Sequence, residues 1–65
     1  MSRVFKFRNG IHEIRKGSVL EFPEDRTRVV VCSFEPGMTI LRYDGESVPE
    51  LWFDREAVED CTFIQ

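Results

Sequence analysis

The chain has 65 residues, a length that accommodates one hydrophobic core and no second domain. Its apolar content of 42%, with six Phe, is too high for a disordered segment and sufficient for a folded core. The net charge of −3 argues against a general affinity for phosphate backbones. We therefore predict a single domain over residues 1–65. Because so small a core leaves stability marginal, assembly into a homo-oligomer stays open.

The amino terminus and the cysteines bear on location and redox state. The segment Met1–Val4 opens no apolar run of signal-peptide length, and no stretch approaches a membrane span, so we expect a cytoplasmic protein without a membrane partner. Cys32 and Cys61 lack the spacing of a zinc or redox motif, and His12 is the only histidine. We expect two buried free thiols rather than a disulfide or a metal site, and no cofactor.

The dipeptide Asn9-Gly10 stands between two alternating segments and predicts a β-hairpin closed by a type I′ turn. A two-residue loop at this position pairs Lys6 with Glu13 across the strands. Alternation then assigns four residues to the inward face: Phe5, Phe7, His12 and Ile14. The outward face is predicted to be basic.

The middle of the chain alternates between strand and turn signals. Gly17 interrupts the pattern, and Ser18–Phe22 resumes it, which indicates a strand that bends and continues. Thr27–Phe34 is rich in β-branched residues and is expected to be the most buried strand. Glu35–Met38 has Pro and Gly at the central positions of a type II turn, so a further strand over Met38–Asp44 should complete a second hairpin.

The carboxyl-terminal quarter combines a strand, a single helical turn and a closing strand. After a polar loop over Asp44–Pro49, Leu51–Phe53 predicts a short strand, Asp54 can cap one helical turn over Arg55–Glu59, and Cys61–Ile64 completes the pattern. This ending resembles that of many SH3-like barrels. The fold class we predict is all-β, a small SH3-like barrel of five to six strands with one short helical turn before the last strand.

The resemblance is architectural and implies no activity. The plasmid-borne dihydrofolate reductases built on this barrel share the ending, but the strand that carries their active site has no recognisable counterpart here, so no family is assigned.

Catalytic groups are sparse. His12 lies on an alternating strand facing Phe7, without a nucleophile at a suggestive spacing, and is expected to be structural. The neighbouring carboxylates Glu24 and Asp25 lie in a turn, where a solvated role is favoured, and the glycines form no phosphate-binding loop. We therefore expect no catalytic residue and no enzymatic activity within one chain. An oligomeric enzyme with a shared central pore is the remaining catalytic alternative.

The charge is distributed unevenly along the chain. Residues 1–28 contain seven bases and four acids, whereas residues 29–65 contain two bases and eight acids. The alternative function is therefore binding of single-stranded nucleic acid through six bases: Arg3, Lys6, Arg8, Arg15, Arg26 and Arg28. Strict alternation places Arg3 on the inward face with Phe5, so Arg3 joins the other bases only if the strand frays. The same alternation separates Phe5 and Phe7 from the bases, which weakens this alternative.

A second surface suggests a protein partner. It consists of two aromatic residues beside an acidic loop: Tyr43, Asp44, Glu46, Glu50 and Trp52. If Leu51 and Phe53 face the core, alternation turns Trp52 outward; the opposite arrangement, with Trp52 in the core, stays open at this point. Our first hypothesis is a non-enzymatic protein-binding module, such as a compact accessory or inhibitor protein of the kind carried by phages and mobile elements. Its acidic surface would then occupy basic contacts on the partner.

Overall fold

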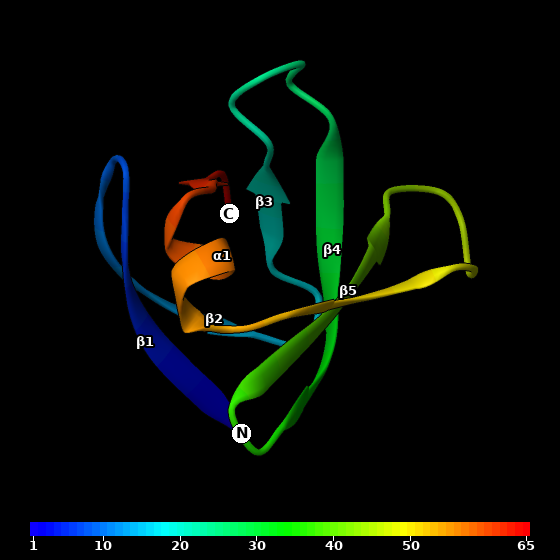
Figure 1. Cartoon of the computed structure of the whole chain (residues 1–65), viewed down its shortest axis with the longest axis horizontal. Coiled ribbons are helices and arrows are strands. Elements are labelled where there is room, and N and C mark those ends of the chain that lie inside the picture. Colours follow the sequence, from blue (N-terminus) through cyan, green and yellow to red (C-terminus); the bar gives the residue numbers. More distant parts are fainter.

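The computed structural model describes all residues 1–65 and shows an all-β protein with one short helix. The strands, in chain order, are β1 (Ser2–Phe7), β2 (Gly10–Arg15), β3 (Val19–Glu21), β4 (Arg28–Glu35), β5 (Met38–Tyr43), β6 (Glu50–Phe53) and β7 (Thr62–Phe63), with helix α1 (Arg55–Glu59) before the last strand (Figure 1). No helix is long and apolar enough to cross a membrane.

The strands form two sheets and not one closed barrel. The prediction that five to six strands close into a barrel is therefore wrong. The β1–β2 hairpin is one sheet, and the other has the order β6-β5-β4-β3-β7. Gly17, with φ of +94°, separates β2 from β3, and its N–H donates to the carbonyl of Val31 at 2.9 Å. Backbone pairing between the hairpin and the large sheet is limited to isolated bonds of this kind, which do not make a continuous ladder.

The register of the β1–β2 hairpin differs by two residues from the sequence-based prediction. Phe7 pairs with Gly10 and Lys6 with Ile11, so the predicted pairing of Lys6 with Glu13 is wrong. The turn lies at Arg8-Asn9, and only Gly10 has a positive φ there, so the predicted type I′ turn is also wrong. An even shift keeps every side chain on its face, which is why the inward face was still predicted correctly.

The core lies between the two sheets and helix α1. Its fully buried cluster draws on most of the elements and contains Phe5, Phe7, Ile14, Leu20, Val29, Val31, Leu41, Val58 and Cys61. The strand with the most buried residues is β5, where three consecutive residues over 39–41 are buried, and not β4 as predicted. In β4 the buried residues alternate with half-buried or exposed ones because its outer face is only partly covered.

Side chains at the hairpin turn join the two sheets. The Asn9 amide donates to the carbonyl of Phe63 at 2.8 Å and accepts from its N–H at 3.0 Å, as a neighbouring strand would. The imidazole of His12 stacks on the Phe63 ring, with ring centres 4.1 Å apart. The Arg8 guanidinium donates to the carbonyl of Asp60 at 2.8 Å. The turn that the sequence identified therefore also ties the hairpin to β7.

Helix α1 covers the outer edge of β1. The helix begins as predicted, with the Asp54 carboxylate accepting the N–H of Ala57 at 2.9 Å. Glu59 accepts the backbone N–H of Lys6 at 3.0 Å. These contacts occupy part of an edge that would otherwise offer free backbone groups to another strand. In Figure 1 the orange helix stands beside the blue hairpin.

The β4–β5 hairpin has the predicted turn. Glu35 pairs with Met38 across Pro36 and Gly37, and Gly37 has the positive φ (+73°) that a type II turn requires at that position. Cys32 has no paired residue in β5, because the register shifts at that point in β4, as in a β-bulge.

Candidate functional site

Trp52 lies on the outside of the molecule. Its two neighbours in β6, Leu51 and Phe53, are half-buried against the core, and the pleat therefore turns Trp52 outward. The side chain is 57% exposed. Of the two arrangements that the sequence allowed, the structure has the exposed one.

Trp52 lies opposite a residue on the outer face of β5. Trp52 pairs directly with Ile40, and directly opposed side chains lie close enough to pack. Ile40 is only 2% exposed although it belongs to the outer face and not to the core cluster. Trp52 therefore covers an apolar residue on one side while presenting its other side to solvent.

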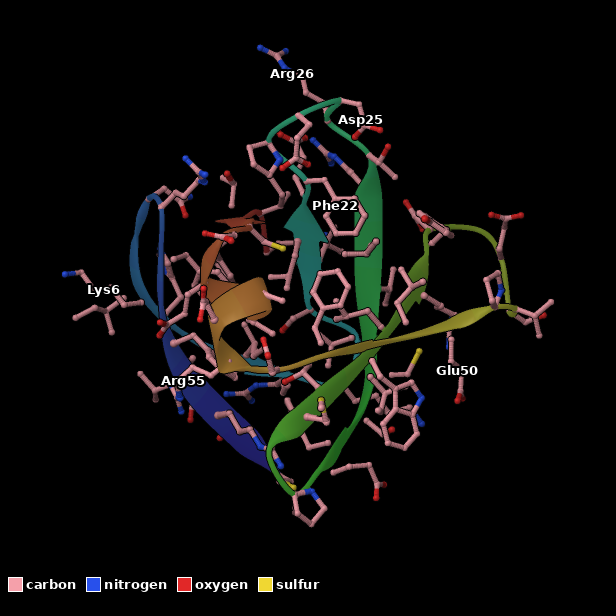
Figure 2. The ribbon with its side chains drawn as sticks, in the orientation of Figure 1. Lys6, Phe22, Asp25, Arg26, Glu50 and Arg55 are labelled. Atoms are coloured by element: carbon pink, nitrogen blue, oxygen red, sulfur yellow. The ribbon has the colours of Figure 1, made fainter.

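An acidic loop adjoins this position. Two residues beyond Ile40, on the same face, Arg42 pairs with Glu50. A hollow of about 430 Å³ opens beside Arg42. The hollow is lined by Val30, Arg42, Asp44, Gly45, Glu46 and Ser47. We call Arg42, Asp44, Glu46, Glu50 and Trp52 together the Trp52 surface. Glu50 points away from the core in Figure 2.

Arg42 is the single base of the Trp52 surface. It is half-buried, and its guanidinium donates to the sulfur of Cys32 at 3.3 Å. Arg42 forms no ion pair within 4.0 Å. The three ion pairs of the chain are formed by Arg15, Arg28 and Arg55. With three carboxylates and one guanidinium, the Trp52 surface carries a net negative charge.

Tyr43 lies on the other face. It pairs with the fully buried Val29, packs against the core cluster and meets the ring of Phe22 edge-on, with ring centres 6.4 Å apart. The structure therefore brings together four of the five residues predicted for the protein-binding surface and places Tyr43 apart from them.

The six predicted nucleic-acid-binding bases do not form one group. Arg3 donates to the carbonyls of Met38 and Glu35 at 2.8 and 2.7 Å, and Arg8 donates to Asp60 as described above. These two guanidinium groups contact backbone carbonyls of their own chain.

The remaining bases are spread over the surface. Arg15 pairs with Glu13 at 3.2 Å and Arg28 with Glu21 at 3.5 Å. A hydroxyl hydrogen bond from Ser2, together with Arg15, lowers the pKa of Glu13 below its usual value. Figure 2 shows Lys6 pointing outward from the hairpin and Arg26 at the tip of the β3–β4 loop, well separated from each other.

A smaller apolar cleft lies between the β3–β4 loop and α1. Its volume is about 240 Å³, and it is lined by Phe22, Pro23, Glu24, Phe53, Ala57, Asp60 and Cys61. Burial, with a smaller contribution from nearby carboxylates, raises the pKa of the Cys61 thiol to about 11. Because the thiolate is the nucleophilic form, a thiol with this pKa that is 2% exposed stays protonated and unreactive at neutral pH.

Cys32 and Cys61 are both free; Cys61 is buried as expected, whereas Cys32 is only half-buried. No group of three or more His, Cys, Asp or Glu side chains is arranged as metal ligands.

Two members of the outer face, Ile40 and Arg42, were not predicted from the sequence. Both would have been found by aligning β5 with β6 through their inward leucines, Leu41 and Leu51, which pair in the structure. That alignment places Ile40 opposite Trp52 and Arg42 opposite Glu50.

Comparison with known proteins gives no relative: no family model, no curated protein and no solved structure matches this chain.

Proposed function

We propose that this chain is a non-enzymatic protein-binding module that uses the Trp52 surface. The observation that carries the proposal is the exposed indole of Trp52, held on a paired strand with Glu50 two residues away on the same face. Tryptophan and arginine are the side chains most enriched among residues that dominate binding energy at protein interfaces.

Burying the rest of the indole would contribute substantially to binding. Aromatic side chains bury 150–250 Å² each, and more than half of Trp52 is still exposed. At roughly 25 cal/mol per Å², covering that remainder is worth about 2–4 kcal/mol. Because β6 pairs with β5 over four residues, the backbone that carries the indole is already ordered, and little backbone freedom is lost on binding.

The charges indicate the chemistry of the partner. Asp44, Glu46 and Glu50 are exposed around a single half-buried Arg42. A partner surface with an apolar pocket for the indole and Lys or Arg side chains around it would complement this arrangement. Such pairs at the rim of an interface mainly accelerate association, so we expect binding to weaken as salt is raised. A basic nucleic-acid channel of a larger protein would be one surface of this kind.

The test is affinity capture by the immobilised chain from nuclease-treated extract of its own cells. The wild type is compared with Trp52→Ala and with the charge reversal Glu46→Lys, Glu50→Lys. The matched control is Ile11→Ala, since Ile11 is a 70% exposed apolar residue on the separate hairpin sheet. We expect the same protein to be retained by the wild type and the control and to be lost with both altered surfaces.

Folding of each variant is checked by circular dichroism and thermal unfolding, because Trp52 also covers Ile40. If Trp52→Ala does not fold, the charge reversal, which leaves the indole in place, decides the question. Retention of the same protein by the charge-reversed variant would contradict the proposal. Capture that occurs only in parallel extract without nuclease treatment would also contradict it and would favour nucleic acid.

A further inference from the structure

A second hollow brings two arginines together from distant parts of the sequence. It has a volume of about 190 Å³ and lies between β1, the β4–β5 turn and α1. Its lining residues are Arg3, Phe5, Gly37, Thr39 and Arg55. Figure 2 shows Arg55 beside β1. The hollow is separate from the Trp52 surface.

The Arg3 guanidinium is fixed on three sides. Its two terminal nitrogens donate to the carbonyls of Met38 and Glu35, and its carbon lies 4.8 Å from the centre of the Phe34 ring. A guanidinium carries five N–H donors, and these contacts use two of them. Arg3 is half-buried, so its remaining donors are held in place rather than free to sample solvent.

The Arg55 side chain is 64% exposed, and contacts within the chain orient its guanidinium. Its carbon lies 4.7 Å from the centre of the Phe5 ring. One terminal nitrogen lies 3.3 Å from the Glu59 carboxylate and 3.5 Å from the carbonyl of Val4. The other terminal nitrogen and Nε make no hydrogen bond within the chain, so donors remain on this side of the hollow as well.

The positive charge at the hollow is only partly neutralised. Arg55 pairs with Glu59, but Arg3 has no carboxylate within 4.0 Å, since the other two ion pairs are Arg15–Glu13 and Arg28–Glu21. Two guanidinium groups line the hollow, and only that of Arg55 has a carboxylate partner. A partly buried cation without a counter-ion favours an anion strongly, because water screens it less than it would at the open surface.

We propose that this hollow binds a phosphate group. Planar guanidinium groups match phosphate oxygens through paired N–H donors. A carboxylate has two oxygens in one plane, whereas a tetrahedral phosphate presents oxygens in several directions and can accept from two guanidinium groups that belong to different elements. Thr39, which is 1% exposed, places a hydroxyl-bearing side chain among the lining residues.

The experiment is a nuclear magnetic resonance titration of the ¹⁵N-labelled chain with inorganic phosphate, at ionic strength held constant with chloride. We expect saturable shifts at the Nε–H signals of Arg3 and Arg55 and at the Gly37 amide. Removing one charged donor group should weaken the affinity about tenfold or more. Arg3→Gln and Arg55→Gln test this expectation. The matched control is Arg15→Gln, which removes an exposed arginine outside the hollow and should bind phosphate as the wild type does.

A second arm replaces inorganic phosphate with glycerol 3-phosphate. Tighter binding of the monoester indicates a phosphate carried on a larger ligand, and tighter binding of the free ion indicates inorganic phosphate itself. If Arg3→Gln fails to fold because Arg3 also holds the β4–β5 turn, Arg55→Gln decides the outcome. Shifts that rise linearly without saturation, or that persist unchanged in Arg55→Gln, would overturn the proposal. Neither result bears on the Trp52 surface, which is tested by protein capture.

Discussion

Arg26 adopts a backbone conformation that its side chain disfavours. It is the only residue other than glycine with a positive φ, at +62°. The left-handed conformation costs an ordinary L-residue roughly 1–2 kcal/mol. The loop holds Arg26 there through two bonds: its own N–H donates to the carbonyl of Phe22, and the next N–H, of Thr27, donates to the Asp25 carboxylate. The second bond lowers the pKa of Asp25 below its usual value.

Replacing Arg26 by glycine should therefore stabilise the fold. Glycine adopts positive φ freely but loses more chain entropy on folding, so we expect Arg26→Gly to raise the free energy of unfolding by up to about 1 kcal/mol. Arg26→Ala removes the same charge and keeps the backbone strain, which makes it the matched control. The measurement is urea unfolding of both variants. An Arg26→Gly variant that is no more stable than Arg26→Ala would contradict the prediction, because relief of backbone strain would then not exceed the chain entropy that glycine loses.

For single residues, the alternation of apolar and polar residues predicted well which face of a strand a side chain occupies. It predicted poorly which other residues that side chain contacts. It placed Ile14 inward, and it placed Arg3 on the face of Phe5, where the structure finds it half-buried. It left open whether Leu51 or Trp52 faces the core. What Arg3 contacts could not be predicted. Its acceptors, the carbonyls of Met38 and Glu35, are 35 and 32 positions away, and their proximity depends on how two separate hairpins pack.

Among the elements, the least conventional contact is the one between the hairpin turn and β7. The Asn9 side chain supplies a donor and an acceptor to the backbone of Phe63, in place of a neighbouring strand. This use of Asn9 accompanies the two-residue shift of the hairpin register: Asn9 stays out of the left-handed conformation, and Gly10 takes the positive φ.

Asn9→Ala should weaken the contact between the hairpin turn and β7. The variant leaves the N–H and carbonyl of Phe63 without their partners, so we expect a loss of about 1–3 kcal/mol in the free energy of unfolding. Lys16→Ala, an exposed turn residue at the other end of β2, should have little effect. Hydrogen exchange of the Phe63 amide gives a local readout. Unchanged exchange at Phe63 together with unchanged stability would show that Asn9 does not join the sheets.

Most of the elements could be predicted from local patterns. Turn chemistry identified the reversal at Pro36-Gly37, and the Asp54 cap identified the helix, because both signals depend on neighbouring residues. The burial of β5 could not be predicted in this way. Its outer face is covered partly by Trp52, which lies in another strand.

Considered as a whole, the molecule is two sheets that meet through side chains. Backbone ladders would have closed the barrel that the strand count suggested, but Gly17 separates β2 from β3, and Asn9 takes the place of a strand beside β7. Whether neighbouring edges pair is decided by contacts between residues far apart in the chain. No local pattern reports those contacts.

The two proposed sites use opposite faces of β5. The Trp52 surface includes Arg42 on the outer face and is acidic, whereas the phosphate hollow includes the buried Thr39 on the inner face and is basic. The two halves of the sequence differ in charge, but the fold does not keep their charged residues fully apart. Arg55 from the acidic half lines the same hollow as Arg3 from the basic half. A protein partner and a phosphate group could therefore bind at the same time.

The proposed function depends on the exposure of Trp52, and fluorescence quenching measures that exposure in the intact protein, because Trp52 is the only tryptophan of the chain. We predict emission close to that of a solvated indole and efficient quenching by acrylamide. Relative to free N-acetyltryptophanamide, caesium should retain more of its efficiency than iodide, since the carboxylates of the Trp52 surface attract cations and repel anions. Blue-shifted emission with little quenching by acrylamide would place the indole in the core and contradict the account.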